Sequence, residues 1–146
     1  MFLSLLYFKD FMKKTKIDNF AGFKYISLIN VPIKSTRHGE MIDMDPQKLD
    51  LIVAKAIIEK QIPIHGKELK FLRKVLGMSL EKFANEIDLV STSVFRWEKN
   101  EDERLAKVNE VAVRAFIAEK LGLSCKPFSF LKGSERTPEY VELRVG

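Results

Sequence analysis

The chain has 146 residues, of which 46% are hydrophobic and 31% are charged, enough for one domain or two small ones. Seven glycines and five prolines are too few for a collagen-like or low-complexity protein, and one cysteine excludes a disulfide framework and a cysteine-rich zinc module. The net charge of +5 is compatible with a polyanionic partner, and the low cysteine content predicts a reducing, cytoplasmic location.

The first eleven residues, MFLSLLYFKDF, are strongly apolar. The apolar run stops at Lys9, without a basic segment before it or a small-residue cleavage site after it. It is also far shorter than the ~20 residues that span a bilayer, so no membrane partner is expected. Three interpretations stay open: an export signal, an element that packs on the protein or a partner, and a leader before a start at Met12.

Residues 23–31, FKYISLINV, are rich in β-branched and aromatic side chains and predict a strand that ends at Pro32. The basic stretch 34–39 then predicts a turn, and residues 40–44 a return strand. Together they predict a β-hairpin.

A helix is expected to begin at Asp45 and Pro46, because Asp is a good N-cap and Pro at the first helical position loses no hydrogen bond. The helix should run to about Lys60 and stop at Pro63. Its expected apolar stripe is Leu49, Ile52, Val53, Ala56 and Ile57.

The stretch 66–121 predicts four more helices. They cover residues 67–76, stopped by Gly77; 79–87, capped by Ser79; 91–99; and 104–121. The last helix has the expected apolar stripe Leu105, Val108, Val111, Ala112, Ala115 and Phe116.

The C-terminal part, 122–146, is expected to be a tail with a strand at 140–145 and a possible second strand at 128–131. The predicted domains are therefore 1–62, a hairpin and helix module; 63–121, the helical domain; and the tail, 122–146. The expected fold class is mainly α with a small β element.

The two short helices 79–87 and 91–99, joined by about three residues and preceded by a supporting helix, have the helix-turn-helix layout. The layout needs a small residue where the helices cross, and Ala84 is there. Asp88 takes the turn position that is usually Gly. Trp97 is expected to close the core, and the other apolar contacts are Phe83, Ile87, Leu89 and Val94.

The segments LRKVLGMS (72–79) and VFRWE (94–98) resemble the lambda-repressor/Cro-type (XRE) helix-turn-helix family over residues 66–100. Within that lambda-repressor-like family the closest subgroup is the MqsA-type antitoxins, through the stretch IHGKELKFLR (64–73). The chain lacks the zinc-binding cysteines of that subgroup, and no metal or cofactor is expected. It also has His65 in place of a Ser or Thr cap and Leu80 in place of Gln.

The resemblance implies that the helix 91–99 enters the major groove of DNA. Its expected DNA contacts are Ser91, Thr92, Phe95 and Arg96, with Ser79 at the start of the preceding helix and Lys99 as nearby charge.

Alternatives stay open for each expected contact. Arg96 would read a guanine or bind a phosphate, and Phe95 would meet a thymine methyl or simply pack. The hydroxyls of Ser91 and Thr92 would bond a base edge or a phosphate. Ser79 would bind a phosphate as well as capping its helix. Arg73 and Glu98 are expected to form an internal ion pair rather than two separate surface charges.

We therefore expect a homodimeric, sequence-specific repressor of a pseudo-palindromic operator on double-stranded DNA, as the antitoxin of a type II toxin–antitoxin operon that it autoregulates. Its protein partner would be the cognate toxin, and the module 1–62 would serve for dimerisation or toxin binding. The dimer would form through the helix 104–121, unless that helix only packs in the core. The alternatives are a phage- or plasmid-type repressor without a toxin, and a protein-interaction module on the same scaffold. No phosphate loop or catalytic constellation is present in the sequence, so no enzyme is expected.

Overall fold

The computed structural model describes residues 13–126, Ser129 and residues 136–146. In these residues five α-helices and a four-stranded sheet form a mixed architecture, in agreement with the expected mainly helical chain with a small β element. The apolar leader 1–11 lies outside the described residues, and of the possible strand at 128–131 only Ser129 is described. No helix in the described part of the chain is long and apolar enough to cross a membrane.

The chain divides into two compact units, one of Met1–Val53 with Pro138–Gly146 and the other of Ala54–Thr137. The C-terminal strand therefore belongs to the same unit as the N-terminal strands, a pairing that the expected division at residues 62 and 121 did not include.

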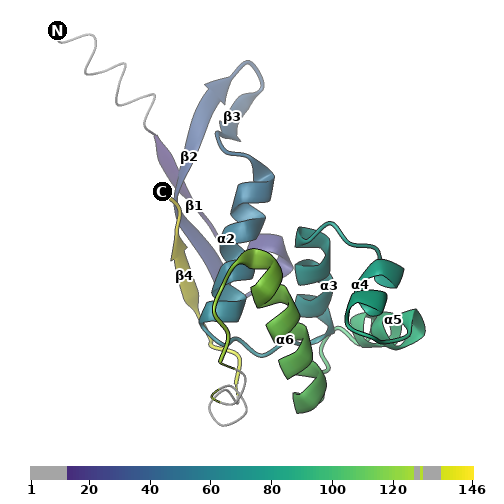
Figure 1. Ribbon diagram of the computed structural model, residues 1–146. Helices are drawn as coiled ribbons and strands as arrows, with labels where there is room; N and C mark the ends of the chain where they lie inside the picture. The colour runs from purple at the N-terminus through teal and green to yellow at the C-terminus, as the bar shows by residue number, and fades with distance from the viewer. Residues whose placement is uncertain (1–12, 127–128, 130–135) are drawn as a thin grey trace, which may run out of the picture. The chain divides into compact units, whose positions relative to one another are not determined.

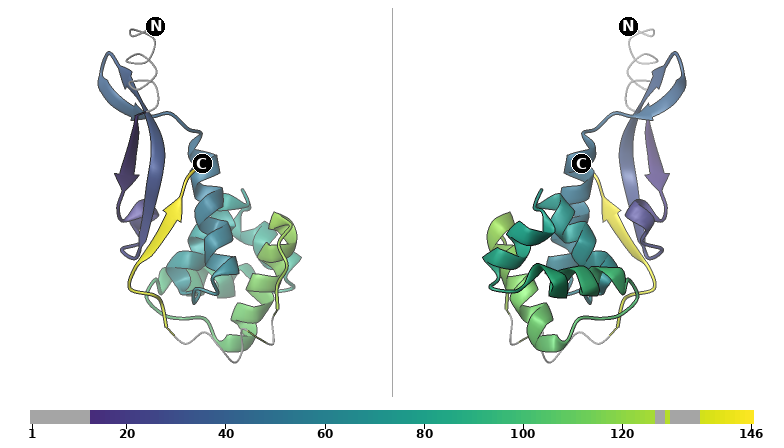
Figure 2. Two further views of the ribbon diagram at one scale, coloured as in Figure 1. Left: turned by 90° about the vertical axis from the view of Figure 1, so that its left-hand side faces the viewer. Right: turned by 90° about the vertical axis from the view of Figure 1, so that its right-hand side faces the viewer.

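The sheet is built around one long strand, β2 (Ile26–Thr36). On one side β2 pairs antiparallel with β1 (Lys14–Ile17). It also pairs antiparallel with β3 (Gly39–Ile42) near its end and parallel with β4 (Val141–Arg144) near its start, as Figures 1 and 2 show. A short 3-10 helix, η1 (Phe20–Gly22), lies between β1 and β2. The predicted hairpin and C-terminal strand are thus confirmed.

A bulge at Asn30 lets β3 and β4 share one edge of β2. The carbonyl of Ile29 accepts a hydrogen bond from the Val145 amide, next to β4. Ile33 lies four residues later, so in a regular strand its amide would face the same edge. Instead, it donates to the Lys13 carbonyl beside β1. The alternation changes at Asn30, whose φ of 65° is left-handed and whose side-chain amide donates to the Val145 carbonyl at 3.2 Å. Without this bulge β3 would bond to the edge that β1 occupies.

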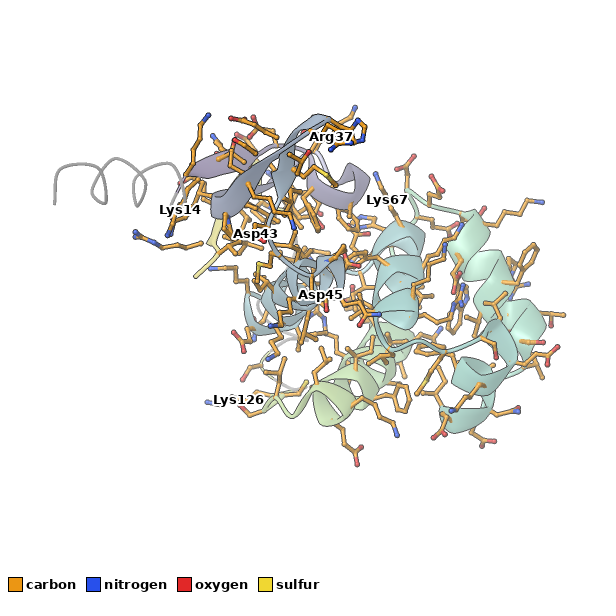
Figure 3. All side chains as sticks on the ribbon, turned by 90° about the horizontal axis from the view of Figure 1, so that it is seen from above. Lys14, Arg37, Asp43, Asp45, Lys67 and Lys126 are labelled. Atoms are coloured by element: carbon orange, nitrogen blue, oxygen red, sulfur yellow. The ribbon has the colours of Figure 1, made fainter. Side chains whose placement is uncertain are left out.

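The prediction that the strand ends at Pro32 was wrong, since β2 continues to Thr36. The Pro32 carbonyl accepts from the Asp43 amide at 2.8 Å, immediately after β3 has ended. The backbone nitrogen of Pro32 faces the same edge of β2 as its carbonyl, beyond the end of β3. The absence of an N–H there therefore removes no hydrogen bond between β2 and β3 and costs little stability. The turn is consequently shorter than expected, with Arg37 at its tip (Figure 3).

Helix α2 (Pro46–Glu59) begins where the sequence predicts, with the Gln47 amide donating to the Asp45 carboxylate at 3.0 Å. Its buried apolar residues include most of the expected stripe, with Ile52 only half-buried. The buried apolar residues of α2 are Leu49, Val53, Ala54, Ala56, Ile57 and Ile58.

The helical unit contains α3 (Gly66–Val75), α4 (Leu80–Glu86), α5 (Ser91–Lys99) and α6 (Lys107–Leu121) (Figure 1). The predicted bounds of α3, α4 and α5 are confirmed to within about one residue. Helix α6 begins three residues later than predicted, because residues 101–105 are hydrogen-bonded to the start of α3 instead. The core of this unit contains Leu69, Leu72, Phe83, Ala84, Val94, Val113 and Ile117.

The predicted apolar stripe of α6 is buried only in part, since Leu105 is buried and Val111 and Phe116 are half-buried. Val108 is 79% exposed, Ala112 and Ala115 are exposed, and the buried face carries Glu110 and Arg114 beside Val113, Ile117 and Ala118. Glu110 accepts from the Ile64 amide and pairs with Arg104, with Nη2–Oε2 at 3.1 Å.

Arg114 Nη1 donates to the Ile57 carbonyl at 3.2 Å, near the end of α2. Buried charges are tolerated where such partners exist, but a sequence pattern assigns charged residues to the solvent. The dimer seam expected on α6 stays a prediction, because Val108, Ala112 and Ala115 leave apolar side chains exposed on this helix.

Candidate nucleic-acid interface

Helices α4 and α5 contact each other and are joined by a tight turn. Ser79 caps α4 as predicted, since its hydroxyl accepts from the Lys82 amide at 3.1 Å. Asp88 adopts the expected left-handed conformation, with φ of 56°. The Leu89 amide then donates to the carbonyl of the buried Ala84 at 2.8 Å and closes the turn. Local signals in the sequence thus predicted this turn correctly.

Helix α5 has one buried and one exposed face. Val94 and Glu98 are buried, at 0% and 6% exposure. The exposed residues follow a spacing of i, i+3, i+4 and i+7 and therefore lie on one side of the helix, namely Thr92, Phe95, Arg96 and Lys99. The predicted contact residues on α5 are brought together on this outward face, with the half-buried Ser91 beside it at the first turn, whereas Ser79 lies at the start of α4.

Trp97 departs from its predicted role in the core. Its side chain is only half-buried and, with Arg96, lines a pocket of about 280 Å³ between the end of α5 and the start of α6. Glu98 occupies the buried position at this end of α5, because Arg73 neutralises its charge there.

The predicted ion pair between Arg73 and Glu98 is confirmed and is bidentate. Arg73 Nε lies 2.7 Å from Glu98 Oε2, and Nη2 lies 2.9 Å from Oε1. Arg73 Nη1 also donates to the Met78 carbonyl at 2.8 Å, and hydrogen bonding to Glu98 raises the pKa of Arg73. A forked, charge-assisted pair has a defined geometry, so it fixes which side of α5 faces α3 and which faces solvent.

The start of α3 approaches the end of α5 more closely than the sequence suggested. A β-carbon on Gly66 would overlap the Trp97 carbonyl oxygen and lie 2.5 Å from that of Asn100. The Gly66 amide donates to the Glu103 carbonyl at 3.1 Å, which holds the loop after α5. The sequence offered one sign of this close approach: glycine is a poor helix former, yet Gly66 is the first residue of α3.

His65 precedes α3, and its ring Nδ1 lies 3.5 Å from Glu68 Oε2. Hydrogen bonding to Glu68 raises the pKa of His65 above its ordinary value of 6.5 in the folded chain. Because the folded state favours the protonated ring, this contribution is complete below pH ~6.5 and is lost as the pH rises through the higher folded pKa. We expect the urea midpoint of unfolding to fall between pH ~6 and ~8.

A His65→Asn variant keeps a good capping residue but removes this titration. Its urea midpoint should change less over the same pH range than that of the unmodified protein. Equal pH dependence of the two proteins would show that His65 is not responsible.

The outward face of α5 combines charge, hydroxyl and apolar groups within about two turns. An α-helix with its side chains is ~10–12 Å wide, and the major groove of B-DNA is ~12 Å wide. Further lysines near these helices are exposed at Lys70, Lys74 and Lys82, and the half-buried Lys67 lies in the first turn of α3 (Figure 3). These features allow contact with phosphates and base edges.

We compared the chain with models of protein families, with curated proteins and with solved structures, and none of the three comparisons gave a match. The resemblance to the lambda-repressor family therefore stays a prediction from the residues.

Proposed function

We propose that α4 and α5 form a helix-turn-helix and that the protein binds duplex DNA sequence-specifically with α5 in the major groove. One observation carries this proposal: Thr92, Phe95, Arg96 and Lys99 share the exposed face of a helix whose opposite face is held by the Arg73–Glu98 pair. A helix held in this way loses little freedom on binding, which favours specific recognition.

On this proposal the protein acts as a cytoplasmic repressor. Residues 66–100 contain seven basic and five acidic side chains, a surplus of only two. Because one weakly charged module gives little affinity, a homodimer on a pseudo-palindromic operator is the form that would bind usefully. Repression of its own operon, with a toxin as the neighbouring product, is the antitoxin form of the proposal. The sheet unit would then hold the toxin.

The test is a fluorescence and gel-shift titration of the full chain against its own upstream DNA, beside a scrambled duplex. Arg96→Ala should weaken specific binding by roughly 5- to 150-fold, since a bidentate guanine contact contributes ~1–3 kcal/mol. Arg37→Ala is the matched control, because Arg37 is exposed at the turn between β2 and β3 and should leave the affinity unchanged.

Two results would contradict the proposal. One is equal, weak binding to both duplexes, which would favour a protein-interaction module and lead to a search for protein partners. The other is an affinity that stays constant between ~50 and ~200 mM salt, because phosphate contacts release counterions.

A further inference from the structure

The exposed phenyl ring of Phe95 is unusual for this unit of the protein. Phe83 on the neighbouring helix is fully buried, whereas Phe95 is 55% exposed. Val90, the N-cap of α5, is 65% exposed. Among the described residues of the helical unit, the other large hydrophobic side chain with comparable exposure is Val108 on α6. Two of these three apolar side chains therefore belong to α5 and its cap.

The neighbours of Phe95 indicate which kind of partner would cover it. Thr92 lies one turn before it, Arg96 follows it directly, and Lys99 lies one turn after it. Phenylalanine and arginine are enriched in protein–protein interfaces, but lysine is depleted there, so Lys99 is the residue that speaks against a protein partner. An apolar ring with two cations beside it on the same helix face fits a polyanion that also presents small apolar groups.

Duplex DNA has such a group on its major-groove edge. The C5-methyl of thymine is the apolar feature of the base edges there, and phenylalanine is among the side chains that contact it. We propose that Phe95 reads a thymine methyl and so sets the base preference of the operator. This inference rests on the proposed function, and it adopts the first of the two interpretations of Phe95 that the sequence left open.

The geometry of α5 also limits where this thymine lies. Phe95 and Arg96 are consecutive, so their Cα atoms are ~3.8 Å apart on a helix ~10–12 Å wide. Their tips can therefore reach points up to about 10 Å apart, which is about three base pairs at 3.4 Å each. Each half-site should contain a thymine within about three base pairs of the guanine that Arg96 contacts.

The first experiment uses duplexes that the full chain selects from a random library. Each thymine of the selected site is replaced in turn by deoxyuridine, which lacks only the methyl group. At one thymine of each half-site the dissociation constant should rise about fourfold, the loss expected for one buried methyl. The other thymines should show no change.

The second experiment places the same change on the protein. Phe95→Ala should weaken binding to the thymine duplex about fourfold or more and remove the difference between thymine and deoxyuridine. Phe95→Leu should keep the difference, because leucine still offers an apolar side chain. Val108→Ala removes a still more exposed apolar group from α6 and is the matched control. Since Phe95 is exposed, these variants should fold, as circular dichroism would verify.

The possible outcomes separate this inference from the proposed function. If a site is selected but deoxyuridine is tolerated at every position, the inference is wrong and DNA binding stands. If the thymine preference persists in Phe95→Ala, another residue reads the methyl and the inference is again wrong. If no sequence is enriched from the library, the proposed function fails and this inference with it.

Discussion

Replacing Glu98 by alanine should lower the free energy of unfolding by about 3–5 kcal/mol. The Arg73 side chain is only 11% exposed, and its Nε and Nη2 atoms both donate to the Glu98 carboxylate. Without that carboxylate the guanidinium stays charged in a largely buried site with only part of its hydrogen bonds. This penalty, rather than the attraction of the pair itself, accounts for most of the expected loss. Urea unfolding measures it directly.

The control for this prediction is Glu86→Ala, which removes an exposed carboxylate from α4 and should change stability by less than ~0.5 kcal/mol. The double variant Arg73→Met with Glu98→Leu replaces both charges by apolar groups and should be more stable than Glu98→Ala. If the losses of the single variants Arg73→Met and Glu98→Leu simply add up to the loss of the double variant, the two side chains are not coupled and the pair does not hold α5 against α3.

Gly66→Ala should destabilise the protein by about 3 kcal/mol or more. The added β-carbon would meet the carbonyl oxygens of Trp97 and Asn100, which are backbone atoms and cannot swing away as a side chain would. Relief would require α3 to move from the end of α5, with loss of the hydrogen bond from the Gly66 amide to Glu103. Thermal and urea unfolding would measure the loss.

Gly77→Ala is the matched control for Gly66→Ala. Gly77 has a φ of 68° and open space where the β-carbon would be, so the substitution costs only the strain of a left-handed residue, about 1 kcal/mol. If Gly66→Ala lowered the free energy of unfolding no more than Gly77→Ala does, the result would contradict the close approach of α3 to α5.

The contacts removed in Glu98→Ala and Gly66→Ala bear on the proposed DNA interface as well as on stability. The Arg73–Glu98 pair and the Gly66 contact join α3 to the buried side and the end of α5. They therefore set the direction in which Arg96 and Phe95 face. If the proposed function is right, a variant that loosens either contact should lose DNA affinity even where most of the protein remains folded.

The sequence by itself determined the features that depend on neighbouring residues. Asp45 and Ser79 cap their helices through amides two and three residues later, and Asp88 tolerates a left-handed turn on its own. The bounds of α5 and the outward position of Arg96 follow from such signals and from helical spacing. These effects act within one turn of the chain, so their residues appear together in the sequence.

The tertiary structure alone decided the features whose partners are distant in the chain. Arg114 is buried because carbonyls of α2 accept its hydrogen bonds, and Glu110 because Arg104 and the Ile64 amide satisfy it. The buried face of α6 therefore differs from the apolar pattern. Gly66 is required only because α5 returns beside it, and β4 pairs with a strand more than 100 residues earlier. A charged side chain can be buried only where hydrogen-bond partners meet it, and a glycine is needed only where another backbone segment packs against it. In both cases the partner is distant in the chain, and folding brings it into place.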